Sequence, residues 1–143
     1  MRILLDAPPN SSCDTIFKIC AEWIRENEKR EGIKMLTHRD NITGDEGAFV
    51  EHFDYKDLKM DGYFYTASMI QNNDYDSGEL VFFDKNADGY VDIIDKEKHW
   101  GKICLWRVGS YQNNYWIPEN FHFLRYSSNG QRRSNVVGIF TNL

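Results

Sequence analysis

The sequence predicts an α+β fold, with one N-terminal strand and a long helix packed on a mostly antiparallel, curved β-sheet of roughly six to nine strands. One segment alone, residues 11–32, has strong helical periodicity. After Gly32, short apolar or alternating runs are separated by Gly, Asn and Asp, as in antiparallel sheets. The 143 residues contain no linker or internal repeat, so we expect a single globular domain spanning 1–143.

The helix over 11–32 follows a short strand at 2–5 that two prolines end. Ser11 and Asp14 have the spacing of a capping box, and Gly32 is a typical helix terminator. We expect a loop at 38–47 and two hairpins, one turning at Asp61-Gly62 and one at 127–134. Among the strands, the nearly all-apolar run 102–108 is expected to be central. The expected strands after the helix are 33–37, 57–60, 63–70, 79–83, 90–94, 102–108, 121–126 and 135–140.

The composition is that of an ordinary globular protein, with 41% hydrophobic and 27% charged residues. A formal charge of −5 gives no general attraction to nucleic acid or to an anionic membrane, so neither is expected as a partner. No stretch has the length of a secretory signal or a membrane span. Three widely spaced cysteines do not form a disulfide framework, and we expect a cytoplasmic protein in which Cys20 and Cys104 are buried packing thiols.

An acidic segment at 84–95, DKNADGYVDIID, has oxygen-bearing groups at alternate positions and a glycine at the sixth. This spacing suits calcium, which binds six to eight hard oxygens. Because both flanks have strand character, the segment resembles the loop of FG-GAP and VCBS-type repeats, which joins two strands and holds calcium. A structural turn without metal is the alternative, so the expected cofactor is none or one structural calcium ion. The candidate ligands are Asp84, Asn86, Asp88, the Tyr90 carbonyl, Asp92 and Asp95.

Cys13 stands at the start of the expected helix, where the helix dipole favours a thiolate. A nucleophile also needs a base and a residue that orients the base. His99 supplies a candidate base, with Asn114, Glu119 and Asn120 further along the chain. In order and spacing, NSSCDTIFKICAEW followed by HW and NNYWIPENFHF resembles the small viral leader proteases of the papain-like class. The resemblance implies catalysis by Cys13 and His99 with Asn114 or Asn120; the alternative is a small residue at a helix start and a surface histidine.

Residues 109–123 are rich in aromatic and amide side chains, a composition typical of recognition surfaces. The same aromatic residues also suit a core, and the sequence leaves the two roles open. Arginines at the tip of the hairpin expected at 127–134 suit anion contacts, or simply a solvated loop. The candidate binding residues are Tyr111, Tyr115, Trp116, Phe121, Arg132 and Arg133.

These features favour a small acidic protein-binding module without catalysis, similar in general character to toxin-neutralising immunity proteins and phage-encoded inhibitors. Its expected partner is another protein, and its oligomeric state is left open. The first alternative is a papain-like cysteine hydrolase or transferase that uses Cys13 and His99. The second is a β-hairpin calcium-loop protein with a structural ion at 84–95.

Overall fold

The computed structural model describes residues 2–42, 55–69, 79–84, 89–95, 101–119, 121–127 and 134–143. Of these, residues 2, 39–42, 79–84, 89–95, 121–127 and 134 are described by their backbone alone. Within these ranges the chain is α+β and every strand pairing is antiparallel, as predicted. The described strands form two sheets, however, where the sequence predicted a single one. None of the helices described there is long and apolar enough to cross a membrane.

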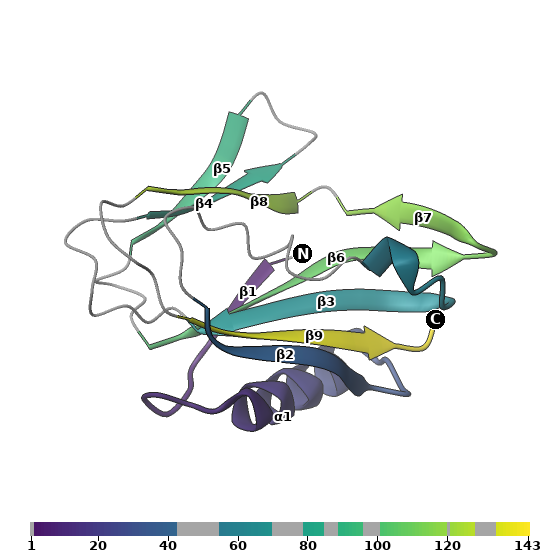
Figure 1. The fold of residues 1–143 in the computed structure, drawn as a ribbon, viewed down its shortest axis with the longest axis horizontal. Helices are drawn as coiled ribbons and strands as arrows, with labels where there is room; N and C mark the ends of the chain where they lie inside the picture. Colours follow the sequence, from purple (N-terminus) through teal and green to yellow (C-terminus); the bar gives the residue numbers. More distant parts are fainter. Residues whose placement is uncertain are drawn as a thin grey trace.

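The described strands form two sheets (Figure 1). The larger has six strands in the order β1-β6-β3-β9-β2, with β7 also paired to β6, and the smaller has three in the order β5-β4-β8. In Figure 1 the six-stranded sheet lies between the helix α1 and the three-stranded sheet. The strand bounds are β1 Arg2–Leu5, β2 Lys34–Ile42, β3 Gly62–Met69, β4 Glu79–Asp84, β5 Gly89–Asp95, β6 Ile103–Gln112, β7 Tyr115–Pro118, β8 Phe121–Ser127 and β9 Ser134–Thr141.

The helix α1 (Cys13–Trp23) continues as one π-helical turn, η1 (Ile24–Glu28), and ends at Lys29 in the left-handed conformation. Ser12, one residue later than predicted, caps it by accepting the Thr15 N–H at 3.2 Å. Ser11 instead donates its hydroxyl to the Pro8 carbonyl oxygen at 2.6 Å. The apolar stripe of α1 packs on one face of the six-stranded sheet, over β2, β9 and β3. Its fully buried contacts there include Ile16, Cys20, Ile24, Tyr65, Ala67, Val137 and Ile139.

A second core lies on the opposite face of the same sheet, because alternate residues of β3 point to opposite sides. Its buried members are Tyr55, Phe64, Tyr111 and Phe140, and Trp116 packs against them. Tyr55 lies in a short 3₁₀ turn, η3 (Tyr55–Asp57), and donates its hydroxyl to the Tyr65 carbonyl oxygen at 2.8 Å. This face therefore has an aromatic core, whereas the α1 face has a mainly aliphatic one.

The helix ends at Lys29, three residues before the predicted terminator Gly32, and three predictions about strands also differ from the structure. Residues 57–60 form no strand, since η3 occupies 55–57 and β3 pairs with β6 and β9 instead of with a hairpin neighbour. The strand β2 extends to Ile42, through the first part of the predicted loop at 38–47. Segments 121–126 and 135–140 do not pair with each other, because β8 pairs with β4, and β9 with β2 and β3. In each case pairing with a distant strand overrides the local turn signal.

Candidate functional site

A tight hairpin joins β6 to β7 at one end of the six-stranded sheet (Figure 1). Gln112 pairs with Tyr115, so the loop consists of Asn113 and Asn114 alone. Both asparagines have positive φ, 54° and 67°, as a type I′ turn requires. Asparagine tolerates this left-handed backbone better than most residues do, so the sequence NN fixes the register of β7 on β6.

The side chain of Trp116 holds β7 against the aromatic core. Its ring centroid lies 5.1 Å from that of Tyr111 and 5.9 Å from that of Phe64. Gly109, opposite Pro118, leaves room for this ring, since a Cβ there would lie 2.5 Å from Trp116 Cζ2 and 2.7 Å from the Ile117 carbonyl oxygen. Tyr111 is buried and donates its hydroxyl to the Lys56 carbonyl oxygen. Trp116 is therefore fixed by packing on the inward side of β7.

The outward side of β7 carries two exposed apolar side chains, Tyr115 and Ile117, which we call the β7 face. They are 76% and 46% exposed, respectively. In the register, Ile117 lies opposite Ser110, and Ser110 lies opposite Tyr63 on β3. Tyr63 packs against the core that α1 covers, so the β7 face belongs to the α1 side of the sheet. The helix itself covers β2, β9 and β3, and leaves the two side chains of the β7 face accessible.

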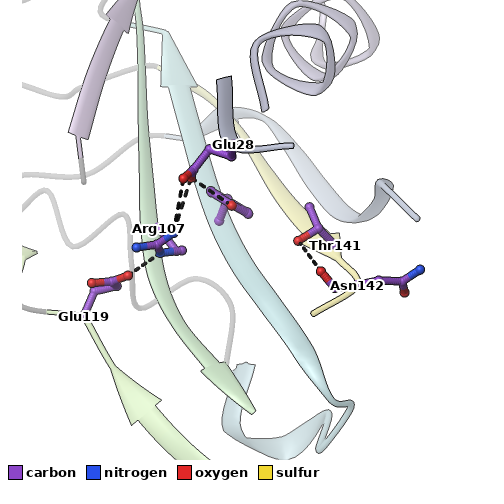
Figure 2. A network of polar contacts seen from close by, with 6 residues as sticks. Glu28, Arg107, Glu119, Thr141 and Asn142 are labelled. Atoms are coloured by element: carbon purple, nitrogen blue, oxygen red, sulfur yellow. Dashed lines mark hydrogen bonds and ion pairs between the residues drawn. The ribbon is translucent and has the colours of Figure 1, made fainter. Parts of the chain in front are cut away.

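Beside the β7 face, a cluster of charged side chains joins β6 to the end of the helix and to the residue after β7 (Figure 2). A bulge at Val108 places Arg107 opposite Tyr65, on the α1 side. Arg107 forms an ion pair with Glu119 and a second with Glu28, in which Nη1 lies 3.4 Å from Oε2. Tyr65 donates its hydroxyl to Glu28 Oε1 at 3.0 Å. We call these four residues the Arg107 cluster.

The Arg107 cluster is held away from bulk water, with the Arg107 and Glu28 side chains 19% and 18% exposed. Burial lowers the pKa of Arg107, but the hydrogen bond and charge of Glu119 and the charge of Glu28 outweigh it, so the net pKa lies above the usual value. Burial, followed by the charge of Glu28, raises the pKa of Tyr65 to about 12. Arg107 is thus permanently charged and Tyr65 remains a donor at neutral pH. Because the Glu119 N–H also donates to the Val108 carbonyl oxygen at 3.1 Å, the cluster anchors the end of β7.

The structure separates the predicted binding residues into different environments. Tyr111 is in the core, Trp116 is half-buried against it, and Tyr115 is exposed. Phe121 begins β8, where the backbone is described. Arg132 and Arg133 lie outside the described residues.

The predicted catalytic residues are not brought together where they can be placed. The Cys13 side chain is buried, and its Sγ lies 3.9 Å from the Val136 carbonyl oxygen. Val136, beside Cys13, is in the same cross-strand row as Ser68 and Cys104. Asn114 lies in the turn that begins after Gln112, at the far end of β6. From Cys104 to Gln112 the strand spans roughly 26 Å, and this distance separates Cys13 from Asn114. His99 and Asn120 lie outside the described part of the chain. Cys20 and Cys104 are buried, as predicted.

The acidic segment joins two strands, as predicted, since Asp84 ends β4 and pairs with Gly89 at the start of β5. Asn86 and Asp88 lie outside the described residues, and the side chains of the other predicted ligands are not described either. The backbone places Tyr90 and Asp92 in β5 and Asp95 opposite Glu79, roughly 20 Å along the strand from Gly89. Gly89 and Asp95 therefore lie at opposite ends of β5. Among the side chains that the structure does describe, no three His, Cys, Asp or Glu residues form a group suited to a metal ion.

Sequence reasoning missed Ile117, Arg107 and Glu28 as members of the site. A usable signal existed for Arg107, because an arginine within the apolar run 102–108 of a central strand needs a charged partner. Nothing local identifies that partner, since Glu28 lies 79 positions away in the sequence. Ile117 is distinguished from a core isoleucine only by the register of β7.

Comparison with known proteins adds no further assignment. The chain matches no protein-family model, and no curated protein or solved structure is significantly similar to it.

Proposed function

We propose that this chain is a protein-binding module without catalytic activity, and that it binds its partner on the β7 face. The observation that carries the proposal is the exposure of Tyr115, 76%, and of Ile117, 46%, side by side on one strand. Tyrosine is enriched in protein interfaces because it offers a large apolar ring with a polar end and few rotatable bonds. The other large apolar side chains exposed in the described ranges, Leu58 and Leu143, lie outside β7.

The rigidity of the β6–β7 hairpin supports a role in recognition. The Asn113-Asn114 turn fixes one end of β7, and the Arg107–Glu119 ion pair fixes the other. Between them, Trp116 is packed into the aromatic core. A surface held in its bound conformation loses little conformational entropy on association, so more of the contact energy is retained as affinity.

Recognition through side chains fits this strand better than the addition of a partner strand to its edge. Pro118 has no backbone N–H to donate, and β7 is only four residues long. Both features limit the backbone pairing that strand addition requires. The proposed partner therefore buries Tyr115 and Ile117 in an apolar hollow of its own surface.

The proposal is tested by affinity capture from the source cells with the wild-type chain and the double variant Tyr115→Ser/Ile117→Ser. A matched control, Lys18→Ser/Glu22→Ser, changes two exposed residues on α1. We expect a protein that the wild type and the α1 control capture equally and that the β7 variant loses at least several-fold. Equal capture by all three, with circular dichroism confirming that each is folded, would refute the assignment of the β7 face. Sedimentation of the purified chain at rising concentration tests whether the partner is a second copy of the same chain.

A further inference from the structure

Arg30 lies in the connection between η1 and β2, which is anchored to the end of β9. The Asn142 N–H donates to the Glu31 carbonyl oxygen at 2.9 Å, immediately after Arg30. Gly32, with φ of 62°, packs so closely that a Cβ would lie 2.2 Å from Asn142 Nδ2. Figure 2 shows Thr141 and Asn142 at the end of β9, and Thr141 is the register partner of Tyr63. The backbone that carries Arg30 is therefore held close to Tyr63.

The guanidinium of Arg30 lies over the ring of Tyr63, with Cζ 3.8 Å from the ring centroid. Stacking of this kind restrains the side chain by contact with the face of the guanidinium. The N–H donors lie in the plane of the group and point away from its edges, so stacking does not occupy them. Arg30 is thus presented as an oriented set of donors.

A comparison with Arg107, which lies near the same ring at 5.0 Å, shows how differently the two arginines are used. Arg107 directs its donors to the carboxylates of Glu28 and Glu119. Arg30 forms no ion pair with any residue that the structure describes, and its Nε is buried without a hydrogen-bond partner. Because Nε is covered, the donors that an anion can reach are those of the two Nη groups, which match the paired oxygens of a carboxylate or a phosphate.

We propose that Arg30 binds an oxyanion, a carboxylate or a phosphate group, on the partner that docks on the β7 face. The existence of a partner rests on the proposed function, whereas the anion site rests on the geometry of Arg30. Tyr63, under Arg30, is in the same cross-strand row as Ser110 and Ile117, so the anion site and the β7 face lie on one side of the sheet. The exposed Lys29 adds positive charge near the loop, which the exposed Glu31 offsets, whereas Lys34 Nζ lies 5.1 Å from the ring centroid of Phe140 in the aromatic core on the other face.

The test is an NMR titration of the full chain, following the arginine Nε–Hε resonances while sodium acetate or sodium phosphate replaces sodium chloride at constant ionic strength. We expect the Arg30 resonance to shift saturably, and the resonance of the exposed Arg25 to move several-fold less. A response to both anions indicates a carboxylate or a phosphate, and a response to phosphate alone indicates a phosphorylated partner. A linear shift of equal size at Arg25 and Arg30 would overturn the inference, because it reports only general ionic effects.

Two variants separate this inference from the proposed function. Arg30→Lys keeps the charge but loses the planar fork, and we expect it to weaken the acetate response of the Tyr63 ring resonances several-fold. Tyr115→Ser/Ile117→Ser is expected to leave the acetate titration unchanged. If no anion binds while capture still depends on Tyr115 and Ile117, the anion site is wrong and the proposed function stands. If the anion binds but the wild type and Tyr115→Ser/Ile117→Ser capture the same proteins equally, the proposed function fails. The assignment of the anion to that partner then fails as well.

Discussion

Replacing Arg107 with methionine removes the positive charge that Glu28 and Glu119 share, while most of the apolar stem is kept. The two carboxylates, 18% and 22% exposed, would then be left without their ion-pair partner. Exposed ion pairs contribute about 0.2–1 kcal/mol, and removal of one member of a fully buried pair costs about 3–5 kcal/mol. At roughly one-fifth exposure we expect Arg107→Met to lower the free energy of unfolding by about 2–3 kcal/mol.

The assay is urea unfolding followed by tryptophan fluorescence, compared with the triple variant Arg107→Met/Glu28→Gln/Glu119→Gln. With the charges of all three members removed together, no unpaired charge remains in the half-buried site. The triple variant should therefore recover most of the loss and fall within about 1 kcal/mol of the wild type. A loss below about 0.5 kcal/mol for Arg107→Met would refute the reasoning, because it would place the cluster among ordinary surface ion pairs. A triple variant no more stable than the single one would refute it as well, by assigning the loss to packing.

Further predictions concern pH, packing, thiols and metal. Because the folded-state pKa of Tyr65 is about 12 against about 10 unfolded, its contribution to stability is complete below pH 10 and falls by about 2–3 kcal/mol as pH rises to 12. In urea titrations at both pH values, Tyr65→Phe should make the loss smaller by that amount, while the buried Tyr55, whose pKa is also raised by burial, still contributes to it. Gly109→Ala forces Trp116 to shift and should cost about 1–3 kcal/mol; an unchanged melting temperature would contradict the packing described. The buried Cys13 should react with a thiol reagent far more slowly in native protein than in denaturant, and fast labelling near pH 6 would instead favour the cysteine-hydrolase alternative. If the acidic segment 84–95 holds a calcium ion, millimolar calcium should raise the melting temperature of metal-stripped wild-type protein and leave that of Asp88→Ala unchanged. Equal wild-type melting temperatures with and without calcium would identify the segment as a polar turn.

Elements whose pattern is local were predictable from the sequence. The helix is identified by its apolar stripe and the serines before it, and β6 by a run of apolar residues. The hairpin predicted at Asp61-Gly62 was wrong for a physical reason. Gly62 is required by close packing, since a Cβ would lie 2.3 Å from both Phe140 Cε2 and the Thr141 carbonyl oxygen. A glycine needed for contact with a distant strand cannot be distinguished from a turn glycine by its neighbours in the sequence.

The candidate site was less predictable than the fold, because its members meet only through strand register. Tyr111 and Tyr115 belong to the same aromatic segment, yet one is buried and the other exposed. Their difference follows from the two-residue turn between them and from the close fit of Trp116 at Gly109. The Arg107 cluster needs the end of the helix, a bulge in β6 and the residue after β7 to come together, which no short-range pattern encodes.

Site-specific photocrosslinking tests the β7 face most directly. A photoreactive phenylalanine derivative placed at Tyr115 probes that face, and the same group at Lys18, exposed on α1, probes a different surface. Both are compared in source cells, with and without Ile117→Ser. The account predicts one discrete adduct from position 115 that Ile117→Ser abolishes, and no such adduct from position 18. The same adduct from both positions, or none from position 115 in a folded chain, would contradict the claim that the β7 face binds a protein partner.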